Sequence, residues 1–145
     1  MAREKYRLLL VEDSDDDVVL FELALRRTGL HEAFEIVRRF SDGAEAIEYF
    51  TLPLSVVDTD PRPEIVVLDL KMPGRSGFEV LAALAKLKER PIVAVFTTSV
   101  LPEDKQKALA LGAEVVQTKT FQSEEFTRFL KALGRLAEER RGIKG

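Results

Sequence analysis

The sequence contains no cysteine among its 145 residues. Disulfides, thiolate metal sites and cysteine nucleophiles are therefore excluded, and the absence fits a reducing compartment. An excess of positive charge is also missing, because the net charge is −3 and the sequence pI is about 5.4. The chain thus lacks the basic footprint of a nucleic-acid-binding protein. We interpret the short pairs Arg38-Arg39 and Arg140-Arg141 as solvated surface.

Long hydrophobic runs are absent too. No segment approaches the roughly 18 apolar residues that span a bilayer, and residues 1–7 are too polar for a signal peptide. We therefore expect a cytoplasmic protein with no membrane partner. Hydrophobic residues make up 46% and charged residues 32% of the chain, which suits one soluble globular domain. We expect this domain to cover residues 1–145, with a core over about 6–138 and a frayed tail over 139–145.

Short apolar runs alternate with segments of helical periodicity along the chain. Runs that are apolar throughout indicate buried strands of a parallel sheet. Their alternation with helices predicts an α/β fold, a doubly wound five-stranded parallel sheet with helices on both faces. The predicted strands cover residues 7–11, 34–40, 64–68, 91–96 and 114–118, and the predicted helices cover residues 15–28, 42–50, 77–88, 102–111 and 124–140.

The connection over residues 51–63 is long for such a fold, in which most loops have roughly 2–6 residues. The simpler interpretation is a surface loop stiffened by its three prolines. The alternative is a segment that contacts a partner, because Leu54, Val56 and Val57 would be exposed unless something covers them. We favour the first and keep the second open.

Polar residues follow four of the five predicted strands, at the edge where doubly wound sheets bind ligands. They are Glu12 and Asp13 after the first strand, Asp69 after the third, Thr97 and Thr98 after the fourth and Lys119 after the fifth. Carboxylates this close repel unless a cation lies between them. Carboxylates, a backbone carbonyl and waters together favour Mg²⁺. Such a metal, with a lysine and hydroxyl donors, would let Asp69 accept a phosphoryl group as an acyl phosphate.

Each of these residues alone has a simpler structural explanation. An acid pair after a strand often supplies a helix cap, as Asp13 would. A single threonine such as Thr97 is mostly structural, and a single lysine such as Lys119 is mostly solvated. Asp69 is harder to explain in this way, because a charge that ends a buried strand is costly without partners. The conjunction of all of them at strand ends favours a functional site.

Four segments resemble the diagnostic segments of response-regulator receiver domains, namely LLLVEDSDDD, VVLDLKMPGRSGFEVL, VAVFTTS and TKTF. The resemblance covers nearly the whole chain, and the D-x-K-M-P-G-x-x-G string that begins at Asp69 is highly specific. It implies a flavodoxin-like (βα)5 fold with the strand order 2-1-3-4-5.

The resemblance also implies a role for each site residue. Glu12 and Asp13 are the acidic metal pair, with Asp13 bound to Mg²⁺ directly, Glu12 bound through water, and Mn²⁺ able to substitute. Asp69 is the phosphoacceptor and a metal ligand, the backbone carbonyl of Lys71 completes the metal site, Thr97 is the switch hydroxyl and Lys119 pairs with the phosphoryl group.

By the same resemblance the chain is a phosphoacceptor signalling domain of a two-component system and not an enzyme. Self-catalysed phosphotransfer and slow autodephosphorylation are expected. A sensor histidine kinase is the phosphoryl donor, and output passes through protein contacts with the kinase, a downstream phosphotransfer protein or a second copy in a homodimer. The long connection over residues 51–63 and the Thr-Thr-Ser after the fourth strand resemble the small regulators paired with bacterial phytochromes.

Two positions depart from the family pattern. Thr120 stands where receivers usually have a proline after the lysine, often in a cis bond. The loop therefore either accepts a costly cis bond or takes another path. Val116 replaces an aromatic residue that turns inward on activation, so that a switch would work through loops and the helix over residues 102–111.

Two rival classes of protein stay open. A phosphatase or phosphotransferase with an aspartyl-phosphate intermediate typically has a second acid two residues after the nucleophile, where this chain has Lys71. A phosphorylation-independent binding module of the same fold fits the departures at Val116 and Thr120.

Overall fold

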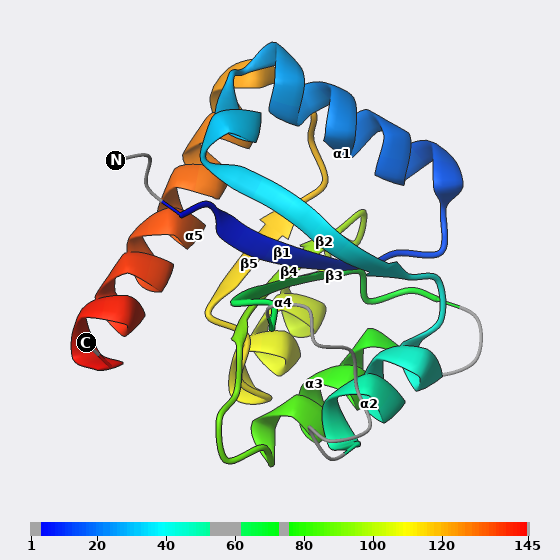
Figure 1. The fold of residues 1–145 in the computed structure, drawn as a ribbon. Helices are drawn as coiled ribbons and strands as arrows, with labels where there is room; N and C mark the ends of the chain where they lie inside the picture. Colours follow the sequence, from blue (N-terminus) through cyan, green and yellow to red (C-terminus); the bar gives the residue numbers. More distant parts are fainter. Residues whose placement is uncertain (1–3, 53–61, 73–75, 145) are drawn as a thin grey trace.

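A computed structural model of the chain describes residues 4–52, 62–72 and 76–144. Its sheet has five parallel strands in the order β2-β1-β3-β4-β5 (Figure 1). They are β1 (Tyr6–Val11), β2 (Phe34–Phe40), β3 (Ile65–Leu68), β4 (Ile92–Thr97) and β5 (Val115–Thr118). The predicted fold class and strand order are therefore confirmed.

The central strands are apolar because both of their faces are covered. Every residue of β3 and β4 is buried, whereas the edge strands β2 and β5 are half-buried over most of their lengths. A strand between two helical layers has no face on which a polar side chain meets water. Polar residues therefore appear only where these strands end, as Thr97 does in β4.

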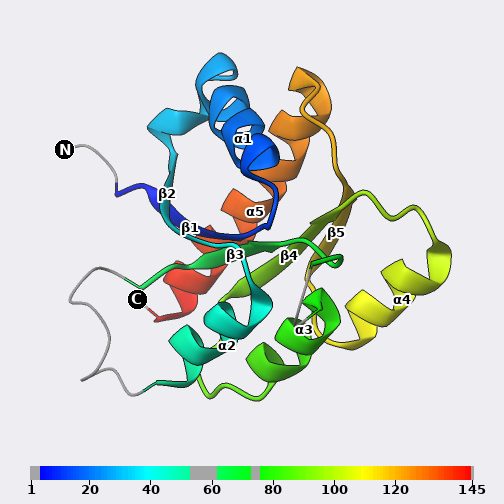
Figure 2. The same ribbon diagram turned by 90° about the vertical axis from the view of Figure 1, so that its right-hand side faces the viewer.

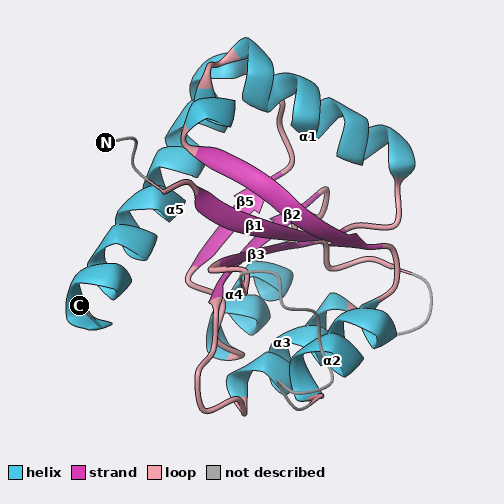
Figure 3. Cartoon of the chain, in the orientation of Figure 1, coloured by secondary structure: helices cyan, strands magenta, loops and turns pink. Residues whose placement is uncertain are grey.

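The helices form two layers, one on each face of the sheet (Figures 2 and 3). One layer contains α1 (Asp15–Arg27) and α5 (Ser123–Lys144), and the other contains α2 (Gly43–Thr51), α3 (Gly77–Ala85) and α4 (Pro102–Ala110). A short 3-10 helix, η1 (Leu30–Glu32), leads into β2. None of the helices in the described ranges combines the length and the apolar character needed to cross a membrane.

The core under α1 and α5 is aromatic. The Phe21 ring lies 5.8 Å from the Phe96 ring and 5.0 Å from the Phe126 ring, both edge-on. The core on the other face is built mainly from aliphatic side chains, including those of Val80, Leu81 and Leu84 in α3. These two cores hold α1 and α3 against the sheet, and both helices begin beside its carboxyl edge.

The last helix is longer than predicted. α5 continues to Lys144, so the prediction of a frayed tail over residues 139–145 is wrong for the described residues 139–144. Arg141 gives the physical reason, because its Nε and Nη2 atoms each lie 2.7 Å from a carboxylate oxygen of Glu64. Arg140 donates from Nη1 to the carbonyl of Arg90 (2.5 Å). The interpretation of this arginine pair as solvated surface is therefore also wrong.

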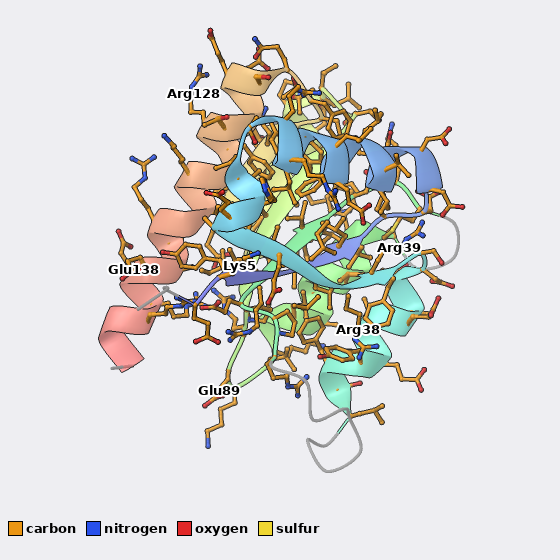
Figure 4. All side chains as sticks on the ribbon, turned by 45° about the horizontal axis from the view of Figure 1, so that its top comes forward. Lys5, Arg38, Arg39, Glu89, Arg128 and Glu138 are labelled. Atoms are coloured by element: carbon orange, nitrogen blue, oxygen red, sulfur yellow. The ribbon has the colours of Figure 1, made fainter. Side chains whose placement is uncertain are left out.

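The pair Arg38-Arg39 in β2 is a second correction. Successive strand residues point to opposite faces, and the two arginines do so (Figure 4). The Arg38 guanidinium lies 5.0 Å from the centre of the Tyr49 ring in α2. On the other face Arg39 Nη1 lies 2.8 Å from Asp15 Oδ1 at the start of α1. Both arginines therefore contact neighbouring helices, whereas the sequence pattern indicated only solvated surface.

The long connection between α2 and β3 was the other open point. Its apolar residues Leu54, Val56 and Val57 lie outside the described residues. The choice between a stiff surface loop and a partner-contact segment therefore stays a prediction.

Candidate functional site

Three polar residues are held at one edge of the sheet by backbone hydrogen bonds that extend the strand ladders. The Glu12 N–H donates to the Phe40 carbonyl (2.9 Å), and the Asp69 N–H donates to the Val11 carbonyl (3.0 Å). The Lys119 N–H donates to the Thr97 carbonyl (2.7 Å). Each residue thus stands one position beyond its strand, and the parallel arrangement brings the three side chains together.

Lys119 is the centre of this cluster. Its Nζ atom lies 2.7 Å from Glu12 Oε1, 2.7 Å from Asp17 Oδ2 and 3.1 Å from Asp69 Oδ2. The side chains of Lys119, Glu12 and Asp69 are only 8%, 10% and 7% exposed, whereas that of Asp17 is 27% exposed. One buried ammonium is therefore shared by three carboxylates.

The pKa shifts reflect this imbalance. Burial of the Lys119 ammonium disfavours its charge, but hydrogen bonds to Asp17 and Glu12 and the charge of Asp69 outweigh burial and raise the pKa of Lys119. Burial raises the pKa of Glu12, and the hydrogen bonds from Lys119 and from the Ser14 N–H oppose this only in part. The carboxylates thus stabilise the protonated form of Lys119, whereas the positive charge near Glu12 does not offset the burial of its carboxylate.

A divalent cation would correct this deficit. Carboxylate oxygens of Glu12, Asp13 and Asp69 all lie within 4.8 Å of one another, which is close enough for one ion to contact them. Glu12 and Asp69 are buried and Asp13 is exposed, so the cluster opens to solvent on the Asp13 side. A set of hard oxygen donors suits Mg²⁺ or Mn²⁺, and the residues present therefore fit such an ion.

Lys71 lies at the same edge, two residues after Asp69. Its backbone N–H donates to Asp69 Oδ1 (3.3 Å), while Asp69 Oδ2 accepts from Lys119. Both oxygens of the Asp69 carboxylate are thus oriented. The predicted metal contact of the Lys71 carbonyl stays a prediction.

Thr97 is buried, with 1% of its surface exposed. Its Oγ1 accepts a hydrogen bond from the Ser99 N–H (3.3 Å), and Ser99 Oγ donates to Asp104 Oδ2 (2.5 Å) in the first turn of α4. Within the described ranges no hydrogen bond joins Thr97 to Asp69. The structure therefore brings Glu12, Asp13, Asp69 and Lys119 together, with Thr97 turned toward the loop before α4.

Gly77 allows α3 to start close to this site. Its N–H donates to the Leu70 carbonyl (3.0 Å). A Cβ atom at this position would lie 2.4 Å from the carbonyl oxygen of Asp69 and 2.6 Å from Cα of Leu70. Only glycine permits this approach of the helix to the backbone that carries Asp69.

Sequence reasoning missed Asp17. It is one of three aspartates in the first turn of α1, and the helix dipole alone explains such a pattern. A signal was present, because Asp17, Phe21 and Ala24 follow the helical spacing i, i+4, i+7, and Phe21 and Ala24 are buried. Asp17 therefore lies on the inward face of α1, where its carboxylate reaches Lys119.

Arg39 was missed for a different reason. Its Nε donates to the carbonyl of Glu12 (2.9 Å), and its Nη1 pairs with Asp15. Arg39 lies in β2, so these contacts tie the loop between β1 and α1 to the neighbouring strand. Nothing in the sequence between residues 34 and 40 indicates this contact. It depends on the pairing register of β2 with β1, which places Arg39 opposite Leu10.

The two departures from the family pattern also have a structural outcome. The peptide bond between Lys119 and Thr120 is trans, so the loop takes the second of the two predicted paths. Thr120 Oγ1 accepts from the Gln122 N–H (3.2 Å) shortly before α5. Val116 is half-buried and packs against the aliphatic core on the α3 face.

The sequence profile of the response regulator receiver domain matches residues 8–131 of this chain. The chain belongs to the response-regulator receiver family. It is therefore a signalling domain of the two-component kind, as predicted.

Similar proteins extend this assignment. The receiver is 32% identical over 127 residues to the transcriptional regulatory protein PrrA of Mycobacterium tuberculosis, a match that covers 88% of this chain and 49% of PrrA. The chain spans about half the length of the curated relatives that it matches.

Solved structures match along most of their own lengths. The phosphorylated cyanobacterial phytochrome response regulator RcpA is 27% identical with a TM-score of 0.71, over 90% of this chain and 91% of RcpA. The Mn²⁺-bound form of the response regulator Rcp1 is 26% identical with a TM-score of 0.70, over 88% and 91%. The structural neighbours of the receiver thus include phytochrome response regulators.

Proposed function

We propose that this receiver accepts a phosphoryl group on Asp69 in the presence of Mg²⁺ and passes the signal on through protein contacts. The arrangement of the Asp69 carboxylate carries the proposal. It is 7% exposed, it is oriented by Lys119 at Oδ2 and by the Lys71 N–H at Oδ1, and it stands beside the acidic pair Glu12 and Asp13.

A family member receives its phosphoryl group from a histidine kinase, and we propose a phosphohistidine as the donor here. An Asp69 carboxylate oxygen attacks the phosphorus in line with the leaving nitrogen. A P–O bond forms, the P–N bond breaks, and its electron pair stays on the imidazole. The protonated Lys119 offsets the charge of the transferring group. Mg²⁺ held by Glu12, Asp13, Asp69 and the Lys71 carbonyl would supply further positive charge.

The switch would begin at Thr97. When its hydroxyl turns to donate to a phosphoryl oxygen, it leaves the Ser99 N–H that it accepts from in this structure. Ser99 is joined to Asp104 in the first turn of α4, so the change reaches that helix. This route needs no aromatic residue at position 116.

The similarity to RcpA supports a narrower proposal about partners. The kinase would be a bacterial phytochrome, the active form would be a homodimer, and a downstream phosphotransfer protein would take the signal further. Phosphotransfer from a purified phytochrome kinase, compared with a kinase of another system, tests the first point. Sedimentation of the phosphorylated and unphosphorylated receiver tests the second.

The central experiment measures intact mass after incubation with acetyl phosphate, with and without Mg²⁺. The native protein should gain the mass of one phosphoryl group only with Mg²⁺, and Asp69→Asn should gain none. An adduct that persists in Asp69→Asn would move the acceptor to another residue. If no adduct forms while a functional receiver is labelled in parallel, the chain is a phosphorylation-independent binding module.

A further inference from the structure

The first-turn aspartate Asp17 occupies an unusual place in the site. It is the third residue of α1, and its backbone N–H donates to Oγ of the capping residue Ser14 (3.2 Å). This cap fixes the first helical turn. The carboxylate then reaches Lys119 Nζ at 2.7 Å, a shorter distance than the 3.1 Å between Lys119 and Asp69.

Each of the three N–H donors of the Lys119 ammonium has a carboxylate partner. An ammonium carries three N–H donors, and the described residues place three carboxylates within 3.1 Å of its nitrogen, those of Glu12, Asp17 and Asp69. A phosphoryl oxygen that is to accept from Lys119 must therefore displace one of them.

Asp17 is the carboxylate that can be displaced at the lowest cost. Glu12 and Asp69 belong to the acidic cluster that fits a cation, whereas Asp17 does not. Its side chain is 27% exposed, against 10% for Glu12 and 7% for Asp69, so water can hydrate it after Lys119 leaves. Release of Asp17 leaves the metal ligands in place.

We propose that Asp17 is a positioning residue that holds Lys119 in the unphosphorylated protein and competes with the phosphoryl group for it. The inference rests on the proposed phosphorylation of Asp69. Asp17 adds a third negative charge around the Lys119 ammonium and so disfavours a doubly charged phosphoryl group at the same place. Asp17 thereby lowers the fraction of receiver that is phosphorylated at a given donor concentration.

The test compares Asp17→Asn with Asp16→Asn, the neighbouring residue in the same helical turn. Asp16 is exposed, and its substitution removes the same charge from the start of α1 without touching Lys119. The ratio of phosphorylated to unphosphorylated protein is measured by intact mass at steady state, with acetyl phosphate and saturating Mg²⁺. Mg²⁺ affinity is measured in parallel by calorimetry, and folding by thermal unfolding.

Asp17→Asn should raise the phosphorylated ratio about three- to tenfold, an effect between that of an exposed ion pair and that of a buried hydrogen bond to a charged group. Asp16→Asn should change it less than about twofold, since exposed charges act weakly through water. The two variants should change Mg²⁺ affinity alike, which separates competition for Lys119 from a general loss of structure or charge. Asp17→Ala, which also keeps the backbone cap, should act in the same direction.

Equal ratios for Asp17→Asn and Asp16→Asn, or a lower ratio for Asp17→Asn in a folded protein, would overturn the role of Asp17. Native protein that is labelled in that experiment still supports the proposed function. Absence of any adduct in the native protein and in both variants would instead overturn the phosphorylation of Asp69 and the inference that rests on it.

Discussion

The two ends of the sheet both gather charged side chains, but with opposite balance. At the amino end the Glu64 carboxylate accepts two hydrogen bonds of 2.7 Å from the Arg141 guanidinium. Nη1 of Arg7 lies 3.7 Å from the same carboxylate. At the carboxyl end one ammonium, that of Lys119, meets three carboxylates. Two arginines therefore surround the one carboxylate of Glu64, whereas three carboxylates surround the one ammonium of Lys119.

The pKa of a glutamate at each end records the difference. Burial raises the pKa of Glu64, but hydrogen bonds from Arg141 and Arg7 outweigh burial, and the net shift is downward. Burial also raises the pKa of Glu12, and there the single lysine does not compensate. The number of cations around each carboxylate therefore accounts for the opposite directions of the two pKa shifts. Three substitutions, one control substitution and the pH dependence of stability test the difference between the two ends.

The largest effect is expected at a glycine on the carboxyl side. The new Cβ of Gly77→Ala would meet the backbone of Asp69 at 2.4 Å, so α3 or the Asp69 backbone must shift. We expect a loss of about 3 kcal/mol in the free energy of unfolding, the upper range for overpacking, together with reduced phosphorylation. Urea denaturation and intact mass measure the two effects.

Gly142 in α5 is the matched control at the amino end. A Cβ added there meets nothing within 4 Å. Gly142→Ala should therefore stabilise the protein by about 0.5–1 kcal/mol through helix propensity. A Gly77→Ala variant that is as stable as the native protein would show that the approach of α3 to Asp69 is not fixed.

The sequence could predict the strand ends but not all of their partners. Glu12, Asp69 and Lys119 were predictable as neighbours, because parallel strands end at one edge and each residue directly follows its strand. Asp17 and Arg39 were not predicted, since their contacts depend on the helix face and on the pairing register across the sheet. Arg141 lies 77 residues from Glu64 and had no local signal at all.

The next largest effect is expected for Glu64→Gln at the balanced end. The substitution leaves the partly buried Arg141 and Arg7 without their shared carboxylate. We expect a loss of about 2 kcal/mol, below the range for fully buried pairs because the Arg141 side chain is 25% exposed. Urea denaturation at neutral pH measures it, and an unchanged midpoint would remove Glu64 from the structural group.

The same chemical change at the other end should have the opposite sign. Glu12→Gln removes one of the carboxylates around Lys119 while its amide oxygen can still accept from the Ser14 N–H. Without divalent cations we expect this variant to be about 1 kcal/mol more stable than the native protein. The gain should shrink when Mg²⁺ is added, because Mg²⁺ stabilises the native protein more than the variant. A loss of stability comparable to that of Glu64→Gln would refute the contrast between the two ends.

The smallest effect is the pH dependence of these two differences. The lowered pKa of Glu64 gives stability that is present above its unfolded value of 4.5 and is lost as the pH falls through the folded value. The raised pKa of Glu12 gives stability that is present below 4.5 and is lost as the pH rises through the folded value. Stability curves from about pH 2 to about pH 8 cover the titration of both groups. The Glu12→Gln curve should meet the native curve near pH 4.5, whereas the Glu64→Gln curve should approach it only as the pH falls below 4.5. At neutral pH, Glu64→Gln should lie below the native curve and Glu12→Gln above it. If both curves lie above the native curve, burial outweighs charge balance at both ends of the sheet. If both lie below it, the carboxylate charge stabilises the protein at both ends, and the contrast between them is wrong.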